Sequence, residues 1–299
     1  MLIAAFDIGG TSVKYGIVSS LGEILEEDSY PTNAIMGGRY VVNKVIEKAI
    51  QLKGKWNIKG ISVSSAGQIN TNKGLVIYAN DNIPGFTGIN LIEEIQKHTG
   101  LSVRAENDVN CAAIGESWKG NAQGLSDFLC VTIGTGIGGA LYLNGSLYRG
   151  SSYAAGEIGH LTLYPGGKKC ACGKLGCFEQ YASSKALEFL ISEKMDKKYG
   201  LKEFFQITRD GNKLGIEIFN HWINDITTGL ASVVHLINID TIIIGGGVSS
   251  QGDFLLKAIQ ESLYEKIMPN HKRKLYIKLA YNANKANLLG ATKHFISSK

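Results

Sequence analysis

The stretch that decides the fold is LIAAFDIGGT at residues 2–11, and a similar stretch, FLCVTIGTGIGG, follows at residues 128–139. In both, an apolar run of the length of a buried strand ends in a glycine-rich loop. A second strand is expected after each loop, at Ser12–Val18 and at Ala140–Leu143, so that each loop closes a hairpin. The match indicates a duplicated unit, with a boundary near residues 119–126.

Strands and helices alternate through the rest of both halves. Further strands are expected at Glu23–Tyr30, Ile58–Ser64, Ser102–Ala105, Ser146–Arg149 and Thr241–Ile244, and helices at Gly38–Lys53, Leu91–Thr99, Val109–Trp118 and Ile216–Asn238. This alternation predicts the α/β class.

Composition excludes several classes of protein. The chain has 299 residues, 44% of them hydrophobic, which is enough apolar surface to exclude disorder for the bulk of the chain. No apolar run approaches the roughly 18 residues of a membrane helix, and the N-terminal stretch is too short for a signal peptide. The net charge is +5, and the charged residues are scattered except for one basic block at residues 271–274. We therefore expect a cytoplasmic protein that binds neither membranes nor nucleic acid.

The two glycine-rich loops can hold phosphate groups, because glycine lets backbone N–H groups approach an anion closely and threonine adds a hydroxyl donor. The residues concerned are Gly9, Gly10 and Thr11 in the first loop, and Gly134, Thr135 and Gly136 in the second. A plain tight hairpin is the alternative for either loop alone. The second loop also spells the dinucleotide-binding fingerprint, but a strand rather than a helix is expected after it, so we exclude a Rossmann site.

Two acidic residues stand at strand ends. Asp7, directly before the first loop, can cap a turn or hold Mg²⁺ through water molecules. Asp108, between a strand and a helix, is the best candidate for a general base that takes a proton from a hydroxyl, with Asn107 beside it to orient that hydroxyl. Capping of the helix would explain one of these residues without a catalytic role. Lys14 either reaches a phosphate or is a solvated strand residue.

A histidine and three cysteines give the strongest local signal. The order His160, Cys170, Cys172, Cys177 supplies one imidazole and three thiolates, the ligand set of a closed structural zinc site. Reduced cysteines in a loop are the alternative. Cys111 and Cys130 lie in apolar segments and are expected in the core.

Six motifs together resemble the ROK family of repressors, open reading frames and kinases, within the actin-like ATPase and hexokinase superfamily. They run in family order over nearly the whole chain, at residues 7–11, 106–108, 133–139, 156–160, 170–179 and 244–248. The resemblance implies a two-lobed fold of duplicated βββαβαβα units, related to ribonuclease H. It places an N-terminal lobe at residues 1–118, joined by a helix at about 285–299, and a C-terminal lobe with the zinc site at 119–284.

The resemblance also implies roles for single residues. Asp108 resembles the catalytic base. The residues that resemble sugar ligands are Gly67, Asn82, Asn107, Glu157, His160 and Glu179, with His160 also bound to zinc. The glycine loops fit the phosphates of ATP, and Gly246 and Gly247 fit its adenosine side.

The implied activity is transfer of the γ-phosphoryl group of ATP, with Mg²⁺, to the primary hydroxyl of a hexose such as glucose or N-acetylmannosamine. A β-glucoside kinase and a non-catalytic sugar-sensing regulator are the alternatives. The first loop begins too early in this sequence for a preceding DNA-binding domain of the repressor type. We expect a homodimer.

Overall fold

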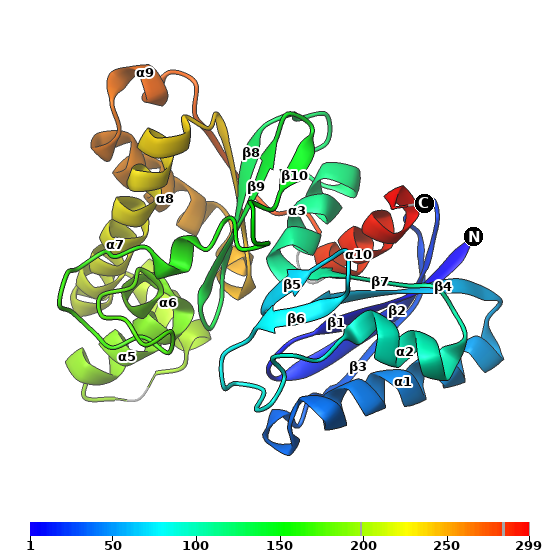
Figure 1. Ribbon diagram of the computed structural model, residues 1–299. Coiled ribbons are helices and arrows are strands. Elements are labelled where there is room, and N and C mark those ends of the chain that lie inside the picture. The colour runs from blue at the N-terminus through cyan, green and yellow to red at the C-terminus, as the bar shows by residue number, and fades with distance from the viewer. Residues whose placement is uncertain (198, 283–284, 299) are drawn as a thin grey trace. The chain divides into compact units, whose positions relative to one another are not determined.

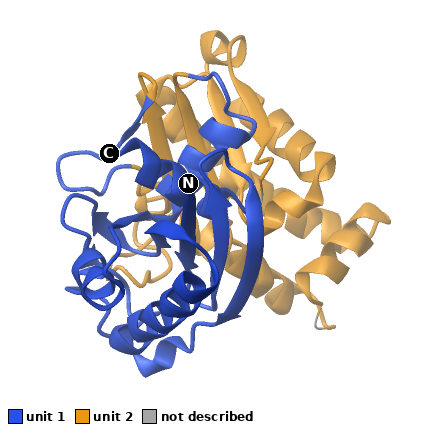
Figure 2. Cartoon of the chain, turned by 90° about the vertical axis from the view of Figure 1, so that its right-hand side faces the viewer, with its two compact units in different colours: residues 1–125, 146–155, 284–299 blue, residues 126–145, 156–283 orange. Residues whose placement is uncertain are grey.

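The computed structural model describes residues 1–197, 199–282 and 285–298. Its contacts divide the chain into two compact units (Figure 2): unit 1 comprises residues 1–125, 146–155 and 284–299, and unit 2 comprises residues 126–145 and 156–283. The sequence analysis assigned residues 146–155 to the second half. They belong to unit 1, where Arg149 pairs with Glu106 and the Tyr153 hydroxyl accepts a hydrogen bond from Asn72. Residues 284 and 299, at the ends of the expected domain ranges, lie outside the described residues.

Unit 1 contains a five-stranded mixed sheet of order β3-β2-β1-β4-β7. Its strands are β1 (Leu2–Ile8), β2 (Ser12–Ser19), β3 (Ile24–Pro31), β4 (Ile58–Ser65) and β7 (Val103–Asn107). β2 is antiparallel to β1 and β3, whereas β1, β4 and β7 run parallel. The carboxyl ends of β1, β4 and β7 therefore meet at one edge of the sheet, where open α/β sheets bind ligands.

Helices cover both faces of this sheet (Figure 1): α1 (Gly38–Lys55) and α2 (Leu91–Thr99) on one, α3 (Asp108–Lys119) and α10 (Ala286–Ser297) on the other. Alternation along β1 decides which side chain faces which helices. Phe6 packs into the core with α1 and α2, and Ala5 packs against Leu288 of α10. The short elements of unit 1 are η1 (Ala34–Met36), β5 (Gln68–Asn70), β6 (Leu75–Tyr78) and β10 (Ser146–Tyr148).

Unit 2 repeats the same pattern of strands. β8 (Phe128–Ile133), β9 (Ile137–Leu143), β11 (Thr241–Gly245) and β12 (Tyr276–Leu279) lie in the order β9-β8-β11-β12. β9 is antiparallel to β8, and β8, β11 and β12 are parallel. A strand follows the loop at residues 134–136, as predicted, where a dinucleotide-binding fingerprint requires a helix.

The central helix of unit 2 is α7 (Lys213–Ile237), whose fully buried Trp222 lies 6.2 Å from the rings of both Phe205 and Phe219. The other elements are η2 (Ile158–His160), α4 (Glu179–Ala182), α5 (Ser184–Lys194), α6 (Leu201–Arg209), η3 (Gly247–Gln251), α8 (Asp253–Lys266) and α9 (Pro269–Lys272). Among the described residues, no helix is both long and apolar enough to cross a bilayer.

Candidate functional site

Asp7 lies at the carboxyl edge of the unit 1 sheet, opposite Ser64 in the parallel register of β1 and β4. Its Oδ1 accepts hydrogen bonds from Ser64 Oγ at 2.7 Å and from Asn287 Nδ2 of α10 at 2.9 Å. The carboxylate is 8% exposed. Both bonds go to Oδ1, and no hydrogen bond to Oδ2 is found within the described residues. Asp7 is thus a fixed carboxylate with one oxygen left for a ligand.

Asp108 begins α3, directly after β7 ends at the same edge. Its Oδ1 accepts hydrogen bonds from the Val109 N–H and from Asn107 Nδ2, each at 2.9 Å. Asn107 also donates to the carbonyl of Gly67 at 2.9 Å, and its own side-chain oxygen caps α3 by accepting from the Asn110 N–H at 3.1 Å. Asn107 therefore holds the base candidate in one orientation while it caps the helix.

Burial and the nearby Asp7 carboxylate raise the pKa of Asp108 from its ordinary value to about 7, although hydrogen bonds from Val109, from Asn107 and from its own backbone lower it. A carboxylate with a pKa near neutrality is a much stronger proton acceptor than an ordinary aspartate and is still ionised in part at pH 7. The residue as a whole is half-buried. These properties suit a general base.

The neighbouring Glu106 has a structural role. It is 1% exposed, and its Oε2 pairs with Arg149 Nε at 2.7 Å. Its Oε1 accepts hydrogen bonds from the Asn107 N–H and from Asn110 Nδ2, each at 2.9 Å. The buried charge is thereby both paired and hydrogen-bonded, as a buried carboxylate requires.

The first glycine loop joins β1 to β2 at the same edge. The Gly9 N–H donates to the Ser12 carbonyl at 3.1 Å, and Thr32 Oγ1 donates to the Gly9 carbonyl at 2.6 Å. A Cβ atom built at Gly10 meets nothing within 4 Å. The loop therefore has open space beside Gly10, and the hydrogen bond from Thr32 holds its Gly9 carbonyl in place. The sequence analysis did not identify Thr32.

Gly67, Lys14 and Asn82 lie in different surroundings. Gly67 has a φ of +92°, and a Cβ there would stand 2.7 Å from the Tyr78 carbonyl, so this site next to Asn107 requires glycine. Lys14 pairs with Asp7 in the β1–β2 register and lines a pocket that also involves Lys285. Asn82 is exposed in a loop.

In unit 2, the four predicted metal ligands come together. The ligand atoms of His160, Cys170, Cys172 and Cys177 all lie within 4.8 Å of one another. Cys170 Sγ is 3.7 Å from His160 Nδ1, and Cys172 Sγ is 3.6 Å from Cys177 Sγ. Ligands bonded to one zinc ion at about 2.0–2.3 Å stand roughly 3.4–3.8 Å apart at the corners of a tetrahedron. The donor set and both distances fit zinc, so the cluster could hold this ion.

Two acidic side chains adjoin the metal cluster. His160 Nε2, on the ring edge opposite Nδ1, lies 4.0 Å from the exposed Glu157. Glu179 Oε1 accepts a hydrogen bond from Cys170 Sγ at 3.2 Å, and its Oε2 lies 2.7 Å from where a Cβ of Gly136 would stand. The cluster and the second glycine loop are therefore neighbours through Glu179.

The second glycine loop lies beside the end of β11. The Gly134 carbonyl accepts a hydrogen bond from the Ser184 N–H at 2.8 Å, and Thr135 is exposed. Gly246 has a φ of +86°, and a Cβ there would lie 2.3 Å from the Ile133 carbonyl, directly before Gly134. Only glycine fits at this junction of two loops.

A pocket of about 530 Å³ opens next to these loops, within unit 2. Its lining includes Ser184, Phe205, Arg209, Gly247 and Gln251. Arg209 donates to Gln251 Oε1 at 2.6 Å and stacks 4.8 Å from the ring of Phe254. The sequence analysis identified Gly247 but missed the others, because α6 and η3 are brought together only by the fold.

A sequence model of the ROK family matches residues 3–297. The chain belongs to the ROK family. The expectation drawn from the six motifs is thereby confirmed, and with it the α/β fold of the family's kinases.

Named relatives in the ROK family cover nearly the whole chain. A β-glucoside kinase of Listeria innocua is 34% identical over 311 residues, covering 100% of this chain and 99% of the relative. A glucokinase of Halalkalibacterium halodurans is 31% identical over 304 residues, covering 95% and 92%. The crystal structure of a ROK family glucokinase from Streptomyces griseus, in complex with glucose and AMPPNP, matches with a TM-score of 0.86 at 28% identity, covering 98% of this chain and 99% of that one.

Proposed function

We propose that the protein is an ATP-dependent sugar kinase that transfers the γ-phosphoryl group of ATP to the primary hydroxyl of a hexose. The observation that carries the proposal is the Asp108 carboxylate, held by Asn107 and raised in pKa to about 7 beside the fixed Asp7. The glucokinase and β-glucoside kinase relatives within the ROK family support the same class of reaction.

Asp108 accepts the proton of the sugar hydroxyl in this proposal. Removal of that proton makes the oxygen a stronger nucleophile toward the γ-phosphorus, and the bond from phosphorus to the leaving oxygen breaks as the new one forms. The Asn107 amide keeps Asp108 Oδ1 in place, so Oδ2 remains for the hydroxyl. Most of the rate of phosphoryl transfer comes from such positioning and from electrostatic stabilisation.

Asp7 is the residue proposed to hold Mg²⁺, through coordinated water. The ion, when bound, neutralises phosphate charge during transfer. The fit rests on the Oδ2 atom that the hydrogen bonds from Ser64 and Asn287 leave available, because Mg²⁺ prefers carboxylate oxygens and water as ligands. Gly9, Gly10 and Thr11 are proposed to bind phosphate oxygens, and Lys14 stays a candidate for the same role.

The candidate residues of unit 2 are proposed to have the roles that the ROK motifs imply. Glu157 and Glu179 would accept hydrogen bonds from ring hydroxyls, and His160 would donate one. Asn82, Asn107 and Gly67 in unit 1 are proposed as further sugar ligands. Zinc bound to His160 Nδ1 would fix the tautomer and direct Nε2 toward the sugar. Thr135, Gly134 and Gly136 would hold phosphates, and the 530 Å³ pocket beside Gly246 and Gly247 would take the adenosine.

A β-glucoside is the second candidate for the substrate, since the relative of that name is 34% identical over the full chain. The experiment is a coupled ADP-release assay with glucose, N-acetylmannosamine, N-acetylglucosamine and a β-glucoside such as cellobiose. Release of ADP that depends on one of these sugars is the expected result. No release with any sugar, together with sugar-dependent binding to DNA or to another protein, would contradict the proposal and favour the regulatory alternative.

A homodimer and a cytoplasmic location remain predictions. Light scattering after size-exclusion chromatography measures the mass directly, and a mass of twice 32.3 kDa is expected.

A further inference from the structure

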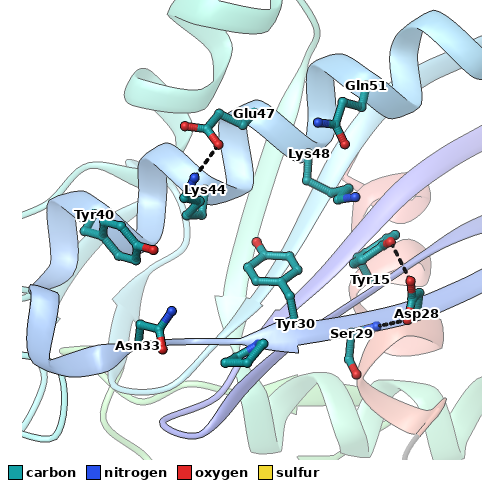
Figure 3. Close-up of a pocket in the computed structure, with 11 residues that line it drawn as sticks. Tyr15, Asp28, Ser29, Tyr30, Asn33, Tyr40, Lys44, Glu47, Lys48 and Gln51 are labelled. Carbon is teal, nitrogen blue, oxygen red and sulfur yellow. Dashed lines mark hydrogen bonds and ion pairs between the residues drawn. The ribbon is translucent and has the colours of Figure 1, made fainter.

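A second pocket, of about 360 Å³, lies in unit 1 away from the residues proposed for catalysis (Figure 3). It is lined by the edge strand β3, by Tyr15 of β2, and by one stripe of α1 that includes Tyr40, Lys44 and Lys48. None of the candidate residues for phosphoryl transfer lines it. Its volume is within the range of about 300–1,000 Å³ for small-molecule sites.

The lining combines aromatic rings with polar groups, and its charges cancel. Lys44 Nζ bonds Glu47 at 2.7 Å, and Lys48 Nζ lies 4.9 Å from the centre of the Tyr15 ring. The Tyr15 hydroxyl donates to Asp28 at 3.1 Å. Two lysines therefore face two carboxylates, so the pocket offers no net positive charge to an anion.

Among the residues that line the pocket, Tyr30 has a side chain with an unsatisfied polar group. Its hydroxyl is buried and has no hydrogen-bond partner within the described residues. It points toward the α1 side of the pocket, between Tyr40 and Tyr15, with Lys44 and Lys48 above it (Figure 3). A buried hydroxyl without a partner is unfavourable and rare in native proteins. Movement of the two flexible lysine side chains would open it to a ligand.

We propose that this pocket binds a neutral saccharide as a second, non-catalytic site. Tyrosine rings offer flat apolar faces to the C–H groups of a sugar ring, and their hydroxyls bond its oxygens. Asn33 and Gln51 add amide donors and acceptors of the kind that neutral hydroxyls match. A sugar hydroxyl would give the Tyr30 hydroxyl its missing partner, whereas a phosphate would meet the Glu47 and Asp28 carboxylates.

Maltose is a suitable probe because it is neutral and has two rings. Equilibrium dialysis of labelled maltose against the full-length protein should show saturable binding. Tyr30→Phe should weaken it about five-fold or more, the loss of one hydrogen bond. Because the buried Tyr30 hydroxyl has no hydrogen-bond partner within the described residues, this variant should keep or raise its melting temperature. Its phosphoryl-transfer kinetics should not change, and the two results together separate a binding role from a structural one.

Two matched variants locate the bound maltose. Tyr276→Phe makes the same change at an exposed residue of unit 2, and Glu157→Gln alters a proposed substrate ligand. Both should leave maltose affinity unchanged. The proposal is wrong if no maltose binds at concentrations on the order of 10 mM, or if Glu157→Gln weakens binding and Tyr30→Phe does not. Binding of glucose 6-phosphate that Lys48→Met abolishes, without binding of maltose, would also overturn it. None of these results depends on whether the protein is a kinase.

Discussion

The two sheets are built alike, yet the edges at which their parallel strands end carry different chemistry. In unit 1, Asp7 is the second-last residue of β1, and β7 leads into Asp108. In unit 2, β8 holds the place of β1 and runs into Gly134, and β11 holds the place of β4 and runs into Gly246. The metal cluster adjoins the Gly134 loop through Glu179. A repeated scaffold thus fixes where a site lies, and the few residues after each strand decide what it does.

Loss of the general base at the edge of the unit 1 sheet should have the largest effect on activity. Asp108→Asn keeps the shape and the Asn107 contact but removes the proton acceptor, so kcat should fall at least about 100-fold. Sugar binding should be largely kept, because no ring-hydroxyl ligand is removed. Steady-state kinetics and sugar titration measure the two effects. Asp196→Asn, at an exposed aspartate of unit 2, is the control, and near-normal turnover in Asp108→Asn would refute the assignment.

The raised pKa of Asp108 predicts a pH dependence of activity, which tests the unit 1 edge without a mutation. Since its pKa is about 7, the ionised fraction falls about ten-fold for each pH unit below that value, and kcat/KM should follow. The free energy of unfolding should change with pH in the opposite direction to the activity. Between the ordinary carboxyl pKa and 7, Asp108 is protonated in the folded protein but ionised in the unfolded chain. Its contribution to the free energy of unfolding therefore decreases as the pH rises. An activity profile that is flat from pH 5 to 7 would contradict the prediction.

Removal of one metal ligand tests the unit 2 edge. Cys172→Ser should lower the zinc content from about one equivalent per chain and raise the sugar KM about ten-fold, by releasing His160. The KM for ATP should change less. Metal analysis by mass spectrometry and steady-state kinetics measure these effects, with Lys174→Ala in the same loop as the control. Native protein with less than half an equivalent of zinc and full activity would show that the cysteines are only a reduced loop.

The glycine loops should give the smallest effects. Gly10→Val and Thr135→Val, one in each unit, should weaken ATP binding about five-fold by blocking or removing phosphate contacts. A side chain at Gly10 has open space, so the fold should tolerate it. Sugar affinity without nucleotide, measured by calorimetry, should stay near normal. An equal loss of sugar affinity would mean that the loops belong to the sugar side.

Local signals explain which elements the sequence predicted. For α2 the predicted range, Leu91–Thr99, is the observed one, because the Asn90 side chain caps its start and Gly100, with a φ of +68°, ends it. β8, Phe128–Ile133, is the apolar run that the sequence places before the second glycine loop. By contrast, β9 begins three residues earlier than predicted, since its ladder with β8 continues to the pair Ile133↔Ile137.

Several elements, most of them short, were not predicted. These are β5, β6, β12, α4, α5, α6, α8, α9 and the three 3-10 helices. β12, for example, has only the four residues Tyr276–Leu279, too few for alternation to separate a strand from a loop. Its pairing with β11 stabilises it, and that contact is not encoded locally.

The candidate site divides in the same way. Asn107 and Asp108 are adjacent in the chain, so their contact was open to prediction, and the metal ligands span only 18 residues, from 160 to 177. The partners that fix Asp7 lie 57 and 280 residues away, at Ser64 and Asn287. No local pattern marks such residues, and only the folded chain brings them together.

The bond between Asn287 and Asp7 also bears on how the protein is made. A ribosome adds about 5–20 residues per second, so Asp7 is exposed for about 15–60 s before its amide donor exists. During that time the face of β1 that carries Ala5 lacks the Leu288 and Leu289 side chains that later bury it. The nascent chain therefore has an uncovered apolar strand surface while residues 126–283 are synthesised, and unit 1 can complete its fold only after unit 2 has been synthesised.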